Sequence, residues 1–436
     1  MTLPVFLRYI SQNILGMLGL SCYILADTLF VSAALGPDGL AALNLSITVF
    51  SIISGVGQLC GVGGGTDYAL RRGKGQDAAH AATTAVTVGM LFALLFAIAG
   101  FLLSAPLSRL LGADETTFAM TEIYVRTTLL FAPVYILNAM MQGFVRNDGA
   151  PHLAILSLLI SSGANIVLDY VFMFPFAMGI FGAVLATGLS ACLAAPVLLS
   201  HFLRKRCSIR FALRLLPLRD LLKQLSYGVS ALIGELASAV SLLTFNLLLM
   251  RLSGYIGVAA YGVIANAALV ATAVFTGLGQ GIQPLASKAH ALCDQTGIRR
   301  LLFYIHGTVL LLSVLIFLLV FRFSQPITGA FNHEHNAQLQ EIAAQGLRIY
   351  FAGYLFAGVN IAGTALLSAV GRTRQALFVS LLRSCVLLIP AAIAFSHTFG
   401  IIGVWLAFVA TEAICCLLSF SFMKADLISE QSDIRS

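Results

Sequence analysis

The sequence predicts an all-α polytopic membrane protein, with twelve transmembrane helices in two pseudo-symmetric six-helix bundles. Three observations support this fold class: an apolar composition, twelve apolar stretches of spanning length, and an internal repeat. Of the 436 residues, 59% are hydrophobic and only 10% are charged, whereas soluble domains are about 25% charged. The composition therefore excludes an ordinary soluble protein of this length.

A helix of about 20 apolar residues crosses the hydrocarbon core of a bilayer. The predicted spans are 10–34, 44–68, 82–105, 121–142, 153–174, 179–203, 225–250, 257–286, 301–323, 348–370, 375–397 and 400–423. The first span lacks a small-residue cleavage pattern and is longer than the apolar core of a signal peptide. We therefore expect it to be a spanning helix and not a cleaved leader.

The Lys and Arg residues predict the orientation, because they are enriched in cytoplasmic loops. With the N-terminus inside, 19 of the 25 Lys and Arg residues fall in cytoplasmic segments, 5 near the outer surface and 1 within a span. We expect both termini in the cytoplasm of a multi-pass protein of the plasma membrane, which is the inner membrane in bacteria. The same asymmetry explains the net charge of +7, so we expect membrane lipid as a partner and no nucleic acid.

The two halves of the chain repeat one another. Motifs recur at a nearly constant spacing, about half the length of the chain: Gly55–Gln58 with Gly277–Gln280, Asn138 with Asn360, Gly149 with Gly371, and Gly179–Ala186 with Gly400–Ala407. Six spans in each half imply that both halves enter from the same side, related by an axis along the membrane normal. We expect an N-lobe at 1–203, a cytoplasmic basic linker at 204–224 and a C-lobe at 225–436, with alternating access by rocking of one bundle against the other.

Two carboxylates, Asp27 and Asp169, interrupt the first and fifth spans. A charge at membrane depth costs at least about 2.5–3.5 kcal/mol and usually marks an ion, proton or substrate site, which favours transport. Asn165 shares a helix face with Asp169, and Tyr23 shares one with Asp27, because each pair is four residues apart. With Thr187 on the sixth span, these oxygens suit Na⁺ or a proton relay. Hydrogen bonds that only join helices are the open alternative.

Polar residues in the second half have other expected roles. Glu235 on the seventh span would attract a cationic substrate if it faces a central cavity, and a helix contact is the alternative. Gln280 and Gln283 on the eighth span are candidate cavity residues, although the repeated Gly-x-Gly-Gln motif also fits a packing role. We expect Arg383 and Glu412 to form an ion pair within the second bundle. The second half has no acid at the positions of Asp27 and Asp169, so ion coupling is expected in the first bundle.

Enzymatic function is not expected, because no nucleophile with a base and no metal cluster is evident at membrane depth. The eight cysteines show no CxxC spacing, so we expect apolar filling and neither a disulfide framework nor a metal site. The glycine-rich stretch Gly55–Gly65 follows no strand, so it is interpreted as close helix packing and not as a dinucleotide fingerprint. No cofactor is expected apart from the coupling ion.

Several motifs together resemble the multidrug and toxic compound extrusion (MATE) family of the MOP flippase superfamily. The stretch from Ala26 to Ala42 is similar to the family's first-span motif, although Ser32 stands where the family usually has Gly. Asn165 to Asp169 looks like the family's Asn-x-x-x-Asp, and similar stretches occur at Gly143–Gly149 and Val263–Pro284. The resemblance covers nearly the whole chain, and its order of motifs carries more weight than any one of them.

The resemblance implies export of organic cations or amphiphilic compounds by antiport with Na⁺ or H⁺, by a monomer. Asp27, Asn165, Asp169 and Thr187 match the family's N-lobe cation or proton site, and these four would hold Na⁺ in a sodium-coupled protein. Tyr23 matches a polar position beside that site, and Glu235 is a looser match to an acidic position in the seventh span.

Two other transporter classes share features with the chain. A lipid or polysaccharide-precursor flippase of the same superfamily is the nearer alternative, although such proteins often have 14 spans and basic cavities. A major facilitator is the other, because Gly63, Asp67, Arg71 and Arg72 fit part of its loop motif. Tyr68 and Leu70 do not fit that motif.

Overall fold

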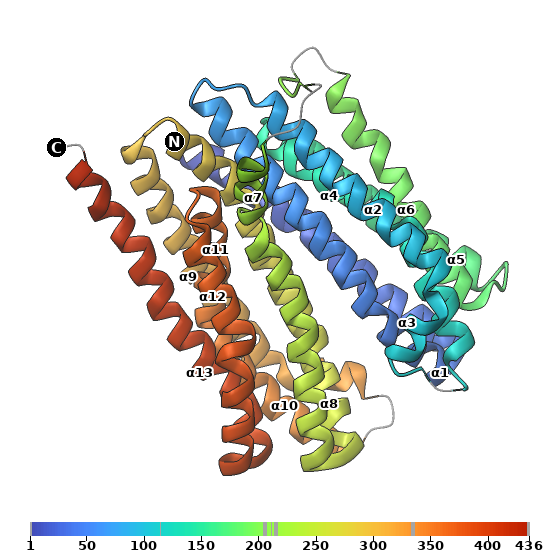
Figure 1. Ribbon diagram of the computed structural model, residues 1–436. Coiled ribbons are helices and arrows are strands. Elements are labelled where there is room, and N and C mark those ends of the chain that lie inside the picture. The colour runs from blue at the N-terminus through green and yellow to red at the C-terminus, as the bar shows by residue number, and fades with distance from the viewer. Residues whose placement is uncertain are drawn as a thin grey trace. The chain divides into compact units, whose positions relative to one another are not determined.

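The computed structural model is helical nearly throughout (Figure 1). It describes residues 2–113, 115–203, 207–210, 212, 217–332 and 336–433, without the side chains of Pro37, Leu40, 237–239, Tyr255 and 424–433. Within these residues no strand is present. The all-α prediction is therefore confirmed.

The helices follow one another along the chain. They are α1 Leu3–Gly73, α2 Ala79–Leu102, α3 Ser104–Leu110, α4 Phe118–Asn147, α5 Pro151–Met173, α6 Gly179–Phe202, α7 Leu218–Ser226, α8 Val229–Ala291, α9 Gln295–Phe331, α10 Ala337–Tyr350, α11 Tyr354–Ala369, α12 Thr373–Leu381 and α13 Leu388–Asp433. A short 3₁₀ turn (Phe351–Gly353) joins α10 to α11, and a π-helical turn (Leu382–Val386) joins α12 to α13.

Three long helices each contain a sharp bend at a glycine. The bends lie at Gly36 in α1, Gly254 in α8 and Gly400 in α13, with φ values of 65°, 60° and 60°. These positive φ angles favour glycine, because they crowd the Cβ of any other residue. Eleven apolar segments of spanning length occur in the described residues, and the 51-residue one at Thr373–Met423 is divided by the Gly400 bend. Twelve spans result, as the sequence predicts.

The ends of several spans differ from the expected limits. α4 begins at Phe118, α9 runs from Gln295 to Phe331, and the helix before α11 begins at Ala337. These helices continue beyond their apolar stretches into polar residues, which a search for apolar runs does not detect. α7 begins inside the predicted basic linker and ends two residues beyond its predicted limit at 224. The linker's basic residues Arg204, Lys205, Arg206 and Arg214 are outside the described part of the chain.

The chain divides into two compact units, Ser11–Leu236 and Met1–Ile10 with Ala237–Ser436. We call them the first and second units. In the second unit the start of α1 packs on α9, where the buried Phe6 ring lies 5.5 Å from the ring of Tyr304. The lobe limits derived from the repeat remain a prediction.

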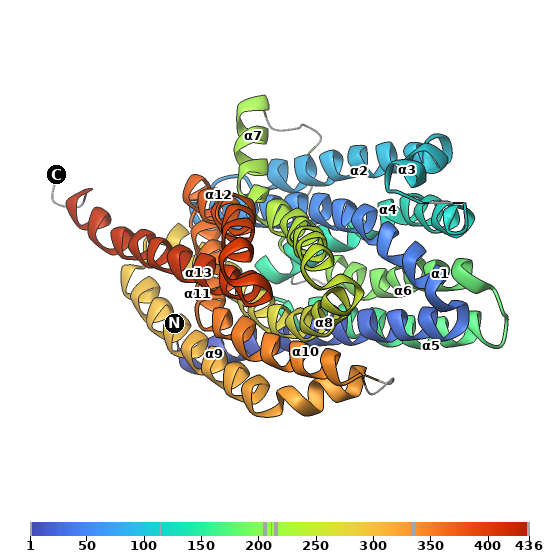
Figure 2. The ribbon, with the colours of Figure 1, turned by 90° about the horizontal axis from the view of Figure 1, so that it is seen from below.

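The first unit is a helix bundle with a tightly packed interior. α2 lies beside α4, and α5 lies beside α6 (Figure 2). A Cβ at Gly61 would lie 2.5 Å from the carbonyl oxygen of Ala139, and one at Gly143 would clash with the carbonyl oxygen of Gly61. The backbones of α1 and α4 therefore touch at these glycines, which confirms close packing as the role of this part of the Gly55–Gly65 stretch.

The repeat is visible in the backbone as well as in the sequence. Gly149 and Gly371 have φ values of 86° and 84°, and Gly179 and Gly400 have 59° and 60°. Each of these pairs is matched by the repeat in the sequence. The two halves therefore turn the chain at equivalent glycines.

One buried hydrogen bond also recurs in both halves. The Asn138 amide donates to the carbonyl oxygen of Ala191 at 2.8 Å, and the Asn360 amide donates to the carbonyl oxygen of Glu412 at 2.9 Å. Ala191 and Glu412 are separated along the chain by the same spacing as Gly179 and Gly400. The acid at Glu412 thus stands where the first half has an alanine.

The predicted pair of Arg383 and Glu412 is confirmed. Arg383 donates to Glu412 Oε1 from Nε at 3.1 Å and from Nη2 at 2.6 Å. Asn360 donates to the other carboxylate oxygen at 2.7 Å, and the Ser419 hydroxyl donates to the Asn360 side-chain oxygen at 2.8 Å. Glu412 is 2% exposed, so its charge is buried and satisfied by partners within the second unit.

Candidate ion-coupling site

The candidate site lies in the first unit, where α1 packs closely on α5. A Cβ at Gly16 would lie 3.0 Å from the side chain of Leu158, and one at Gly19 would lie 3.0 Å from the side chain of Leu159. Small residues at such contacts let membrane helices approach closely. The face of α1 that carries these glycines is therefore the face against α5.

Asp27 follows on this same face of α1. Gly19, Tyr23 and Asp27 are spaced by four residues, so their side chains lie above one another. Tyr23 and Asp27 therefore lie on the face of α1 that packs on α5, the helix that carries Asp169.

The amide and hydroxyl of the predicted site also meet. Asn165 on α5 donates to the Thr187 hydroxyl on α6 at 3.3 Å, and that hydroxyl donates to the carbonyl oxygen of Ala183 at 3.2 Å. Asn165 is 1% exposed and Thr187 is 9% exposed. The contact with α6 therefore uses the NH₂ group of Asn165 and leaves its amide oxygen available to a ligand.

Four oxygens at the site have no hydrogen-bond partner within the described part of the chain. They are Asp27 Oδ1, Asn165 Oδ1 and both carboxylate oxygens of Asp169. Asp27 is 7% exposed and Asp169 is fully buried. A buried carboxylate without a partner is strongly unfavourable while it is charged. The arrangement therefore suits a group that holds a cation or a proton.

Ser162 belongs to the same polar face, although it is not among the residues predicted from the sequence. Its hydroxyl is buried and has no hydrogen-bond partner within the described residues. It would lie 3.6 Å from a Cβ at Gly19, so it faces α1. The spacing of Ser162, Asn165 and Asp169 at i, i+3 and i+7 is the signal that identifies it.

The three predicted substrate residues belong to different units, with Glu235 in the first and Gln280 and Gln283 in the second. Glu235 lies near the start of α8 and is half-buried, and a Cβ placed at Gly55 of α1 would lie 3.5 Å from the Cβ of Glu235. Gln280 is buried and Gln283 is half-buried, and both belong to the second unit. Their role in substrate binding remains a prediction.

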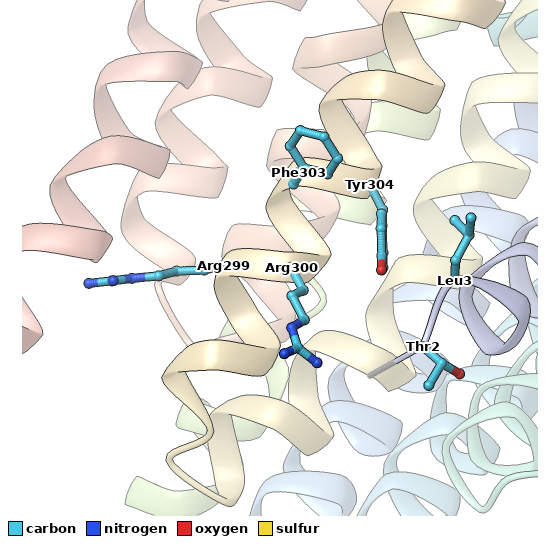
Figure 3. A pocket seen from close by; sticks show the side chains of 6 residues that line it. All are labelled: Thr2, Leu3, Arg299, Arg300, Phe303 and Tyr304. Carbon is cyan, nitrogen blue, oxygen red and sulfur yellow. The ribbon is translucent and has the colours of Figure 1, made fainter.

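A surface pocket of about 530 Å³ lies in the second unit and contains none of the predicted site residues (Figure 3). It is lined by Thr2, Leu3, Arg299, Arg300, Phe303 and Tyr304. Figure 3 shows Arg299 extending away from the other side chains. Exposed arginines and aromatic rings at the start of a spanning helix are typical of a membrane–water boundary.

The chain matches known sequences over most of its length. The sequence model of the family described as MatE matches residues 13–171 and 231–394. Multidrug export protein MepA of Staphylococcus saprophyticus is 25% identical over 383 residues, covering 87% of this chain and 84% of that protein. The protein of the same name from Staphylococcus aureus is 25% identical over 422 residues, covering 95% of this chain and 92% of that protein.

Solved structures show the same fold. An outward-facing multidrug resistance MATE transporter of the MOP superfamily superimposes with a TM-score of 0.91 at 22% identity, over 98% of this chain and 96% of that one. A mutant of the Vibrio cholerae MATE transporter VcmN superimposes with a TM-score of 0.90 at 22% identity, over 98% and 97%. These likenesses establish the arrangement of helices, which agrees with the predicted twelve-helix, two-bundle fold.

Proposed function

Because the chain belongs to the MatE family, we propose that it is a secondary active efflux transporter that exports organic cations or amphiphilic compounds in exchange for Na⁺ or H⁺. Multidrug efflux is supported by the two staphylococcal export proteins, which match it over most of its length. The exchange for an ion is supported by the candidate site.

The observation that carries the proposal is the set of unpartnered oxygens on Asp27, Asn165 and Asp169. A bound Na⁺ or proton neutralises part of this buried charge. With the ion bound, the first bundle can therefore adopt a conformation in which the site is closed to water, because no carboxylate is left unpaired in an apolar interior. Without the ion, the carboxylates are most stable where water reaches them. Ion binding therefore changes the relative stability of the conformations that are closed to water. Alternating access that is coupled to an ion requires such a change. In a sodium-coupled cycle, Asp27, Asn165, Asp169 and Thr187 would hold the ion.

The experiment that tests this function is transport by the purified full-length protein in proteoliposomes. A Na⁺ gradient and a pH gradient are imposed separately, and export of a cationic dye is followed against protein-free vesicles. We expect one of the gradients to drive dye against its concentration difference. Equal dye movement with neither gradient present would contradict coupled exchange.

Glu235 is the residue through which we expect charge selectivity. Loss of one desolvated charge contact weakens cation binding by roughly 1.5–3 kcal/mol, or about tenfold to more than a hundredfold in affinity. Glu235→Gln should therefore weaken export of a cationic dye by at least about tenfold and leave export of a neutral dye nearly unchanged. The measurement is a side-by-side efflux assay of the two dyes, with ion binding determined separately.

The matched control for this variant is Glu341→Gln, which removes an exposed carboxylate from α10. It should leave both dyes unaffected. If Glu235→Gln reduces export of both dyes equally, Glu235 acts as a helix contact and not as a substrate ligand.

We also propose that both termini and the segment between the repeats face the cytoplasm. The asymmetry of Lys and Arg and the even number of spans support this orientation. Reporter fusions after Ser436 and in the 204–224 segment should both show a cytoplasmic location. A periplasmic signal from either fusion would refute it.

A further inference from the structure

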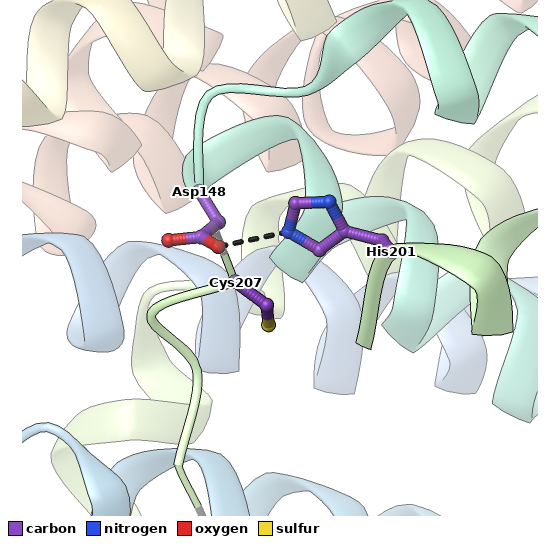
Figure 4. Close-up of side chains that lie close together, drawn as sticks. All are labelled: Asp148, His201 and Cys207. Atoms are coloured by element: carbon purple, nitrogen blue, oxygen red, sulfur yellow. Dashed lines mark hydrogen bonds and ion pairs between the residues drawn. The ribbon is translucent and has the colours of Figure 1, made fainter. Parts of the chain in front are cut away.

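Three side chains with metal-binding atoms meet in the first unit (Figure 4). None of the three is a predicted transport residue. Asp148 directly follows α4, His201 lies in the last turn of α6, and Cys207 lies in the chain that follows α6. One ligand atom from each lies within 4.8 Å of the other two. No short motif joins the three, because Asp148 is far from the other two in the sequence.

The cluster is largely shielded from water. The side chain of Asp148 is 1% exposed and that of His201 is 6% exposed. His201 Nε2 and Asp148 Oδ2 are 2.8 Å apart, and Cys207 is half-buried.

The carboxylate of Asp148 is held in position by groups that are not themselves metal ligands. Its Oδ1 accepts from Arg72 Nη1 at 2.6 Å and from the Ser208 hydroxyl, and the Ser208 backbone N–H donates to Oδ2 at 3.0 Å. The Tyr68 hydroxyl lies 3.4 Å from Oδ1. Hydrogen bonds of this kind orient the carboxylates that bind metals in known sites.

We propose that Asp148, His201 and Cys207 bind one late first-row divalent cation of the zinc type. Thiolate, imidazole and carboxylate together select Zn²⁺ and its neighbours over Mg²⁺ or Ca²⁺, which prefer oxygen ligands only. Zn–ligand bonds of about 2.0–2.3 Å in a tetrahedral arrangement put ligand atoms about 3.3–3.8 Å apart. Small side-chain rotations bring Asp148 Oδ2, His201 Nε2 and Cys207 Sγ to this spacing. In these rotations Oδ2 and Nε2, now 2.8 Å apart, separate slightly. A water molecule would complete the coordination.

The charges and protons of the bound state balance. Cys207 releases its thiol proton to solvent on binding, and His201 binds through Nε2 with its remaining proton on Nδ1. Arg72 can keep its contact with Oδ1 while Oδ2 binds the metal, because its side chain is 51% exposed and has room to adjust. The bound cation would fasten the start of the segment between the repeats, at Cys207, to the ends of α4 and α6.

Zinc binding to the untagged full-length protein in detergent tests the proposal. The protein is dialysed against buffered Zn²⁺, and bound metal is measured by elemental analysis. We expect one Zn²⁺ per chain, and a loss of affinity of more than about a hundredfold in Cys207→Ser and in His201→Gln, since even outer-shell substitutions weaken metal sites by about 10–100-fold. Co²⁺ in place of Zn²⁺ should give the absorption band of a thiolate–cobalt bond, absent from Cys207→Ser.

Cys293→Ser is the matched control, because Cys293 is an exposed free cysteine outside the cluster. It should keep both the stoichiometry and the cobalt band. In the wild-type protein Zn²⁺ should also slow alkylation of Cys207 and leave alkylation of Cys293 unchanged, with each site read by peptide mass spectrometry. Cys207→Ser keeps the Ser208 contacts to Asp148, so it should fold. Absence of the cobalt band from the wild-type protein, or equal zinc affinity in wild type and Cys207→Ser, would overturn the proposal.

Discussion

Asp169→Asn should reduce ion-driven export to the level of protein-free vesicles while leaving expression and folding nearly intact. The amide of Asn cannot hold a proton or offer the negative charge that a cation requires at this position. Both oxygens of Asp169 make no hydrogen bond to the described part of the protein, so the substitution removes no structural contact. The measurement is dye export by purified protein in proteoliposomes under whichever ion gradient drives the wild type.

Asp38→Asn is the matched control for this variant. Asp38 is an exposed carboxylate close to the bend of α1, so its loss changes the net charge equally without altering the buried site. Full export by Asp38→Asn alongside none by Asp169→Asn would support a coupling role for Asp169. Full activity of well-folded Asp169→Asn would refute that role.

Arg383→Met should destabilise the second unit by about 3–5 kcal/mol, because it leaves the Glu412 carboxylate buried without its cation. Asn360 would remain the donor to that carboxylate, and one neutral hydrogen bond does not compensate for a lost charge. The measurement is unfolding by denaturant in detergent, followed by fluorescence of Trp405. This is the single tryptophan of the chain, and it lies buried beside Tyr261 in the same unit.

Two further variants control for this effect. The double variant Arg383→Met/Glu412→Leu removes both charges and should recover much of the lost stability, since apolar replacements of a buried ion pair are often neutral. Arg299→Met removes an exposed arginine and should change stability little. If Arg383→Met unfolds at the wild-type denaturant concentration, the pair does not stabilise the unit.

Much of the architecture could be predicted because its signals are local in the sequence. The length of an apolar run decides whether a helix can cross a bilayer, and the constant spacing between matching motifs reveals the repeat without knowledge of any contact. Part of the candidate site could be predicted for the same reason, because its signals are also local. Asn165 and Asp169 share a face because they are four residues apart on one helix, and an acid inside an apolar run signals function by its cost alone.

Only the tertiary structure decided the contacts between helices that are far apart in the sequence. The bond from Asn165 to Thr187, the missing partners of Asp169, and the second donor to Glu412 from Asn360 each depend on how two helices pack. The spacing of Ser162 places it on the face of Asn165 and Asp169, but only the packing shows that this face meets α1 at Gly19. The cluster of Asp148, His201 and Cys207 had no sequence signal at all, because a helix end, a last turn and a connecting segment meet there only after α4 and α6 have packed. Side-chain periodicity is set within one helix, whereas a site shared by several helices is set by the packing that brings their faces together.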